Sequence, residues 1–252
     1  MTASFATNLA SRLQDLRREG GSRRTWLAIR TRLLSGILGV LFESRRRIVT
    51  LERIGSQYGG WAVPKDLISS EWICYCGGAG EDITFDLGII ERFGVHVYCF
   101  DPTPRSAAHV ARAAEGVSRF HFYPVGLWDR NENVRFFAPR DPNHVSHSAL
   151  NLQGTEEYFV APCQRISSIM RELHHGRIDL LKIDIEGAEY AVLRSLLEDG
   201  LVVKVLCVEF DQPMPVLATA RMILQLKRAG YQPVHAESWN YTFIHESAMC
   251  RS

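Results

Sequence analysis

One stretch of the sequence decides the fold, and it reads Glu71-Trp72-Ile73-Cys74-Tyr75-Cys76-Gly77-Gly78-Ala79-Gly80. Residues 71–76 form the kind of apolar run that makes a buried strand, and the glycines after it predict a turn. Residues 81–93 then carry apolar side chains at helical spacing. The stretch and its continuation therefore predict a strand, a tight turn and a helix.

The same alternation continues along the chain. Further strands are predicted at 95–100, 119–125, 178–185 and 204–210, and further helices at 104–115, 166–173, 188–197 and 215–229. Strands that alternate with helices predict crossover connections and a mostly parallel, doubly wound α/β sheet with helices on both faces. Two final strands, 231–236 and 241–244, lie too close together for a helical crossover. They predict an antiparallel addition at the sheet edge.

One segment of the body departs from this alternation. Residues 134–138 predict an extra strand, and residues 139–163 are polar and irregular, with three prolines. A connection of this length inside a compact domain is typical of a lid or a substrate loop.

The composition is that of an ordinary globular protein. The chain has 252 residues, of which 46% are hydrophobic and 23% charged, and this excludes collagenous, disordered and disulfide-scaffold classes. A formal net charge of +1 gives no indication of nucleic-acid binding. The cysteines within strands are expected to be small buried hydrophobes in a reducing compartment, and no zinc spacing is present. With no secretory signal visible, we expect the body to be cytoplasmic.

Charge is distributed unevenly between two segments. Residues 1–54 contain 11 arginines and 4 acidic residues, a net charge of +7, which leaves −6 on residues 55–252. We therefore divide the chain into a basic helical N-terminal arm, 1–54, and a catalytic body, 55–252, which begins with an entry loop at 55–65. The arm either packs on the body or on a second copy of the chain, giving a homodimer, or lies as an amphipathic helix on an anionic membrane surface.

The glycine turn indicates a nucleotide-type cofactor. Glycines let a ligand approach the backbone, and the start of the following helix offers unpaired N–H groups. Asp101 lies 21 residues after Gly80, at the end of the next strand, where a carboxylate can accept the hydroxyls of a ribose. A dinucleotide fits poorly, because Ile83 replaces the third glycine and Glu81 and Asp82 would repel a pyrophosphate. S-adenosylmethionine, with a ribose and a positive centre, fits better. The alternative is an ordinary turn with a capping aspartate.

A second constellation lies in the strand predicted at 178–185. Alternation along a strand puts Lys182, Asp184 and Glu186 on one face, although a central strand should be apolar on both faces. Asp184 and Glu186 would then emerge at the carboxyl end of the sheet, where such folds bind ligands. Glu209 and Asp211 end the next strand and either line the same crevice or cap loops. The alternative for the first set is a local ion pair between Lys182 and Asp184.

Three runs together resemble the FkbM family of S-adenosylmethionine-dependent O-methyltransferases, over about residues 70–245. They are 75–82 with the glycine turn, Phe100-Asp101-Pro102-Thr103-Pro104, and Leu181-Lys182-Ile183-Asp184-Ile185-Glu186-Gly187-Ala188-Glu189. The resemblance implies a class I, Rossmann-like sheet of seven strands, the last antiparallel. It also implies a cofactor site, which we assign to Cys76, Gly78, Ala79, Gly80, Asp101, Gly126, Leu127 and Trp128. The last three would lie near the adenine, although Trp128 could equally be a core aromatic residue.

The resemblance also implies the reaction. The family methylates hydroxyls of sugars, glycolipids or secondary metabolites, so we expect an acceptor of that kind. Asp184, Glu186, His147 and Lys182 are the candidate catalytic residues, with His144 as a further candidate base. No resident metal is predicted, although Asp184 with Glu186 or His147 could hold a divalent ion. The alternatives are an NAD-type Rossmann oxidoreductase and a non-catalytic, membrane-associated protein that retains the fold.

The basic arm generates the first testable prediction. Each Lys or Arg near an anionic leaflet contributes about 1 kcal/mol of binding, and salt weakens this attraction. We expect the full chain to bind anionic vesicles in co-sedimentation and to release them as salt rises. Removal of residues 1–48 should abolish vesicle binding while calorimetry still detects S-adenosylmethionine binding. A truncated protein that instead changes its oligomeric state or precipitates would show that the arm packs on protein.

Overall fold

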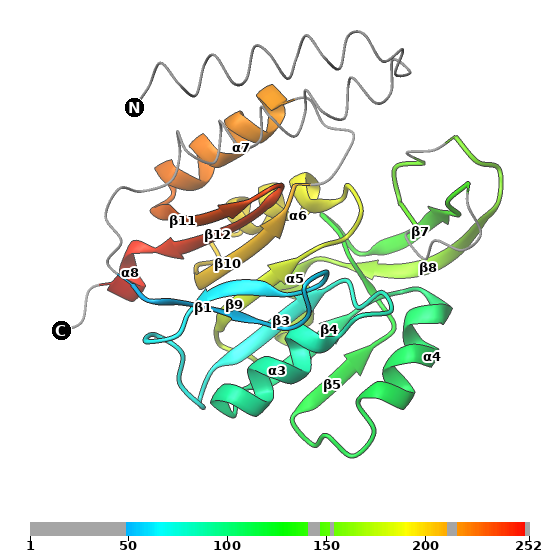
Figure 1. The fold of residues 1–252 in the computed structure, drawn as a ribbon. Helices are drawn as coiled ribbons and strands as arrows, with labels where there is room; N and C mark the ends of the chain where they lie inside the picture. The colour runs from blue at the N-terminus through cyan, green and yellow to red at the C-terminus, as the bar shows by residue number, and fades with distance from the viewer. Residues whose placement is uncertain (1–48, 141–146, 152–153, 211–215, 250–252) are drawn as a thin grey trace, which may run out of the picture.

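The protein is described from a computed structural model that covers residues 49–140, 147–151, 154–210 and 216–249. Its centre is a seven-stranded sheet in the order β11-β12-β10-β9-β3-β4-β5 (Figure 1). The strands are β3 (Ile73–Gly77), β4 (His96–Phe100), β5 (Phe120–Tyr123), β9 (Ile178–Ile183), β10 (Val203–Glu209), β11 (Tyr231–Glu237) and β12 (Asn240–His245). The predicted class I sheet is therefore confirmed.

The last strand, β12, is antiparallel as predicted, but it does not lie at the sheet edge. β12 pairs antiparallel with both β10 and β11, so it is inserted between them and β11 forms the edge. A two-residue turn, Ser238 and Trp239, joins β11 to β12. The short connection dictates that β11 and β12 pair antiparallel with each other. Which of the two strands pairs with β10 depends on tertiary packing.

Helices cover both faces of the sheet, as the alternation predicts. One face carries α5 (Ile166–Glu172), α6 (Glu189–Glu198) and α7 (Val216–Arg228), and its core includes Leu193, Leu226 and Phe243. The other face carries α3 (Thr84–Phe93), α4 (Pro104–Ala113) and the short α8 (Glu246–Met249). Helix α3 begins three residues later than predicted, because the Asp82 side chain accepts the backbone N–H of Thr84 at 2.9 Å and ends the turn there.

The start of the body contains a hairpin that was not predicted. β1 (Leu51–Ile54) pairs antiparallel with β2 (Trp61–Pro64), so residues 51–54 are a strand and not part of a helical arm, and the predicted entry loop at 55–65 contains β2. Val63 is fully buried, and the Thr242 hydroxyl of β12 donates to the Ala62 carbonyl oxygen at 2.8 Å. The hairpin thus covers the sheet over β12. Predictions about residues 1–48 concern a segment outside the described residues.

A second sheet is inserted between β5 and α5. It consists of β6 (Gly126–Leu127), β7 (Glu132–Phe137) and β8 (Tyr158–Gln164), in the order β6-β8-β7. β7 matches the predicted extra strand, but β8 lies where irregular chain was expected, because Pro162 argues against a strand. At Pro162, β8 pairs with β7 alone, because β6 pairs only with Cys163 and Gln164, so the proline lies where β8 is an edge strand.

The core cysteines have the environment that the sequence predicts. Cys74, Cys76, Cys99 and Cys207 are free thiols with no exposed surface. Burial raises the pKa of all these thiols, which therefore stay protonated and unreactive. Within the described ranges, no cluster of three or more His, Cys, Asp or Glu residues could hold a metal ion. The same ranges contain no helix that is both long and apolar enough to span a membrane.

Histidines and tyrosines gather on one face of β3, β4 and β5. Tyr98 stacks on His121 with ring centroids 4.7 Å apart and meets His175 edge-on at 4.4 Å. Tyr75 Oη lies 2.7 Å from Nδ1 of His175, and His96 Nδ1 lies 3.4 Å from Nε2 of His121. Burial lowers the pKa of His121 and His175, and neighbouring histidines lower it further. The folded state therefore resists protonation of His121 and His175.

This cluster makes stability depend on pH. The unfolded chain takes up protons near the ordinary histidine pKa of about 6.5, before the folded chain does, so each such histidine lowers the free energy of unfolding as the pH falls. We expect urea unfolding to show a smaller loss of stability between about pH 7 and pH 5 in His121→Gln than in the wild type. Other titrating groups are common to both proteins, so parallel stability curves would contradict the assignment.

Candidate functional site

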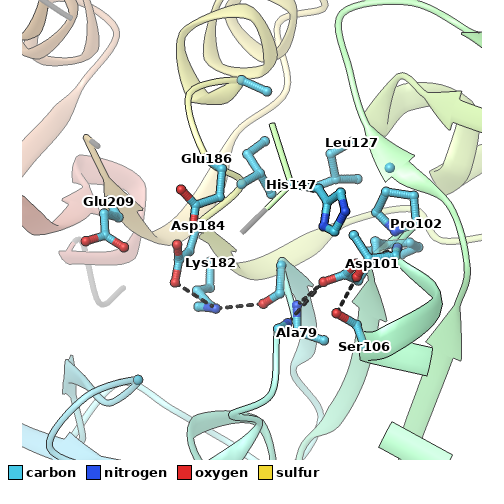
Figure 2. Close-up of a pocket in the computed structure, with 18 of the residues that line it drawn as sticks. Ala79, Asp101, Pro102, Ser106, Leu127, His147, Lys182, Asp184, Glu186 and Glu209 are labelled. Atoms are coloured by element: carbon cyan, nitrogen blue, oxygen red, sulfur yellow. Dashed lines mark hydrogen bonds and ion pairs between the residues drawn. The ribbon is translucent and has the colours of Figure 1, made fainter. Parts of the chain in front are cut away.

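A cavity of about 220 Å³ opens where the carboxyl ends of β3 and β9 meet (Figure 2). The chain order reverses between these two strands, and the crevice at such a switch point is where doubly wound sheets bind ligands. All but one of the predicted site residues line it: Gly78, Ala79, Gly80, Asp101, Gly126, Leu127, Trp128, His147, Lys182, Asp184 and Glu186. The exception is Cys76, which is fully buried and does not reach the cavity.

Asp101 organises the glycine turn. Its Oδ2 accepts the backbone N–H groups of Ala79 at 2.9 Å and Gly80 at 3.0 Å. Its Oδ1 accepts the Thr103 N–H at 2.8 Å and the Thr103 hydroxyl at 2.6 Å. A carboxylate offers about four lone-pair positions, and these four hydrogen bonds use them. In this structure Asp101 therefore shapes the turn, and a ribose hydroxyl would have to share or displace one of these donors.

The glycines of the turn meet two different requirements. A Cβ on Gly78 would lie 1.8 Å from the Asp184 carbonyl oxygen, so only glycine lets the turn pack against the segment after β9. Gly80 has a φ of 52°, and a Cβ there would meet nothing within 4 Å. The first glycine serves the contact within the protein, and the second leaves open space beside the backbone, where a ligand can approach.

Lys182 links the turn to the acidic motif. Its side chain is only 4% exposed, and Nζ donates to the Gly78 carbonyl oxygen at 2.9 Å and lies 3.5 Å from Oδ2 of Asp184. Burial lowers the pKa of Lys182, but the attraction of Asp184 and Asp86 outweighs it, so this pKa lies above its ordinary value. Lys182 is thus a permanent cation. It forms the ion pair given above as the alternative, and it cannot serve as a proton acceptor.

Acidic side chains dominate the rest of the lining. Figure 2 shows Asp184, Glu186 and Glu209 on one side of the pocket and Asp101 on the other. Glu81 and Asp82 complete the set, whereas Lys182 is the one lysine or arginine among the described lining residues. An acidic lining in a partly enclosed site attracts a positively charged ligand. Asp211 and His144, also considered from the sequence, lie outside the described residues.

The inserted elements supply lining residues that the sequence pattern did not reveal. The β1–β2 hairpin contributes Tyr58 and Trp61, the inserted sheet contributes Phe136, and the start of β12 contributes Asn240. His147 belongs to the long irregular segment, and its ring lies 5.2 Å from the ring of Phe159. These residues lie far apart in the sequence and in no recognisable motif, so only the fold brings them together.

The residues present fit S-adenosylmethionine. The open space beside Gly80 admits a ligand to the turn, Phe100 and Leu127 give apolar surface, and the carboxylates suit a sulfonium and an ammonium group. Trp128 also lines the cavity while its Nε1 donates to Glu132 at 3.0 Å. Fold and site together define the class as a class I methyltransferase.

Comparison with known proteins gives the family. The model of the methyltransferase FkbM domain matches residues 78–233, which is more than half of the chain. The chain therefore belongs to the FkbM methyltransferase family, as the three sequence runs predicted, and its cofactor is S-adenosylmethionine. The match favours this prediction over the oxidoreductase alternative.

Two curated relatives and two solved structures are also similar. Probable methyltransferase-like protein 24 of Rattus norvegicus is 34% identical over 128 residues, which cover 50% of this chain and 29% of the relative. The Homo sapiens protein of the same name is 32% identical over 129 residues, with the same coverage. The chain therefore spans less than a third of the length of these relatives.

The structures are more distant. Methyltransferase FkbM from Methylobacillus flagellatus KT has a TM-score of 0.46 and 16% identity. The match covers 71% of this chain and 44% of the Methylobacillus chain. Aeropyrum pernix fibrillarin, solved with natively bound S-adenosyl-L-methionine, has a TM-score of 0.40 and 9% identity. The match covers 81% of this chain and 86% of the fibrillarin chain.

The four hydrogen bonds to Asp101 lead to a prediction about cofactor affinity. Asp101→Asn replaces one of the two acceptor oxygens by an NH2 group and removes the charge, so the side chain can no longer accept at both the Ala79–Gly80 and the Thr103 donors. Hydrogen bonds to a charged group contribute about 1.5–3 kcal/mol each, so calorimetry should show S-adenosylmethionine affinity reduced at least about tenfold. Glu115→Gln, an exposed change just after α4, is the control. Unchanged affinity in Asp101→Asn would mean that the turn is held by other contacts.

Proposed function

We propose that the protein is an S-adenosylmethionine-dependent O-methyltransferase that acts on a hydroxyl of a sugar, glycolipid or secondary metabolite. One observation carries the proposal. The acidic segment after β9 and the glycine turn after β3 line the same cavity and are joined through Lys182. Candidate proton acceptors therefore lie beside the residues that fit the methyl donor.

The protein has to position an acceptor hydroxyl and receive its proton. The cofactor supplies an activated methyl group on its sulfonium. Asp184 is paired with the Lys182 ammonium, 3.5 Å from Nζ, which holds the carboxylate in place. We assign Asp184 the role of orienting the hydroxyl. Glu186 and His147 line the same cavity and are the candidates for accepting the proton.

The lining also bears on the class of acceptor. Carboxylates outnumber cations among the described lining residues, which disfavours acceptors that carry phosphate or carboxylate groups near the methylated hydroxyl. Tyr58 is 90% exposed and lines the cavity together with Trp128. Aromatic side chains of this kind can pack against the apolar face of a sugar ring, which supports a neutral glycan or glycolipid.

A substitution at Asp184 tests this function. Asp184→Asn keeps the shape of the side chain and removes its charge. We expect labelled-methyl transfer into extracts of the source cell to fall by at least about tenfold, while cofactor affinity changes by less than about threefold. Glu115→Gln should leave both unchanged. If transfer per folded molecule survives in Asp184→Asn and only the melting temperature drops, Asp184 belongs to the structural ion pair alone.

The same assay separates the two candidate bases. His147→Asn should lower turnover at least about tenfold if His147 receives the proton, with Glu186→Gln close to the wild type. The reverse pattern is expected if Glu186 receives the proton. Retention of full turnover in both variants would exclude both residues as the base.

A further inference from the structure

Glu189 is a buried carboxyl group directly behind the acidic segment. It is the first residue of α6, has no exposed surface and is not among the residues that line the cavity. Its Oε1 accepts the backbone N–H of Ile185 at 2.9 Å and that of Gly187 at 3.2 Å. The two hydrogen bonds bracket Glu186, so one side chain fixes the backbone on both sides of a candidate base.

The backbone that Glu189 holds is unfavourable by itself. Glu186 has a φ of 55° and Gly187 a φ of 101°, both in the left-handed region. An L-residue with a Cβ, such as Glu186, rarely adopts this conformation unless other contacts impose it. A second contact comes from the long irregular segment, where the Ser148 hydroxyl donates to the Glu186 carbonyl oxygen at 2.8 Å. Glu186 is therefore held from two directions, by Glu189 and by Ser148.

We propose that Glu189 is a positioning residue for methyl transfer, which holds Glu186 in the cavity and does so as an uncharged carboxylic acid. The proposal rests on the function proposed above, because it matters for turnover only if the acidic segment acts on the acceptor. Glu189 does not contact the reacting groups, so its effect passes through the backbone of residues 185–187.

The surroundings of Glu189 support the uncharged form. Its Oε2 is buried and has no hydrogen-bond partner among the described residues, which is costly for a charged oxygen. Burial raises the pKa of Glu189 to about 8, and the nearby Asp184 carboxylate raises it as well. Tyr190, the next residue of α6, stays neutral because burial raises its pKa to about 12. An uncharged acid can be replaced by glutamine, whose amide oxygen accepts the same two N–H groups.

The experiment compares three variants. Glu189→Gln keeps the acceptor oxygen, Glu189→Ala removes it, and Ser195→Ala is the control. Ser195 is also buried in α6, and its hydroxyl donates within the helix to the Val192 carbonyl oxygen at 3.0 Å, away from the turn. Ser195→Ala should lower the melting temperature without affecting residues 185–187.

Three readouts are measured for each variant: amide hydrogen exchange at Ile185 and Gly187, labelled-methyl turnover, and the pH profile of turnover. We expect both amides to lose protection in Glu189→Ala only, and turnover per folded molecule to fall at least about tenfold there and nowhere else. Below about pH 8, Glu189→Gln should keep the wild-type amide protection and the wild-type pH profile of turnover, because the uncharged amide accepts the same two N–H groups.

The contrary outcomes are distinct. Protected amides in Glu189→Ala would overturn the positioning role whatever the activity. Equal turnover in Glu189→Ala and Ser195→Ala would reduce Glu189 to a structural residue. Loss of amide protection or turnover in Glu189→Gln below about pH 8 would overturn the uncharged form. If the amides respond as expected but the wild type transfers no label, the proposed function fails. The hydrogen bonds by which Glu189 holds the backbone at Ile185 and Gly187 would still be supported.

Discussion

The site depends on one buried cation in the central strand of the sheet. Lys182 lies in β9 opposite Cys76 of β3 and Cys207 of β10, in a row that is otherwise apolar or weakly polar. A buried ammonium requires partners that compensate for its lost hydration. The Gly78 carbonyl and the Asp184 carboxylate provide them, and Asp86 on α3 adds attraction from below the sheet. The requirement therefore ties the glycine turn, the acidic segment and helix α3 to one point.

The carboxyl groups around the cavity are divided between two tasks. Asp82, Asp101 and Glu189 are engaged by hydrogen-bond donors of the protein, and each fixes one stretch of backbone: the start of α3, the glycine turn and the segment after β9. Asp184, Glu186 and Glu209 line the cavity on the side opposite Asp101 and make that side acidic, which attracts a positively charged ligand. Rigid backbone of this kind supports catalysis, because the acceptor atom has to meet the methyl donor in one geometry.

Elements outside the seven-stranded sheet enclose the site. The β1–β2 hairpin brings Tyr58 to the cavity, and the inserted sheet brings Leu127 and Phe136. The loops at the carboxyl edge of the sheet thus carry the parts common to the fold, while these two additions shape the entrance. Acceptor preference should therefore depend mainly on the hairpin and the inserted sheet, since loops and insertions vary more freely than the elements that pack the core.

The sequence by itself determined the alternation of strands and helices, the glycine turn, the pairing of that turn with Asp101, and the position of Lys182, Asp184 and Glu186 at the carboxyl end of one strand. These are local features, set by a periodicity of two or 3.6 residues and by glycine at a close approach, so neighbouring residues suffice to predict them. Tertiary structure alone decided that Cys76 faces the core and that β12 lies between β10 and β11. It also decided that residues 51–54 form a hairpin strand and that β8 forms despite Pro162. It also decided that Asp101 uses all its acceptor positions on the protein and that Glu189 lies buried behind Glu186. Each of these depends on which distant backbone groups and side chains come within contact distance, and local sequence patterns do not encode such distances.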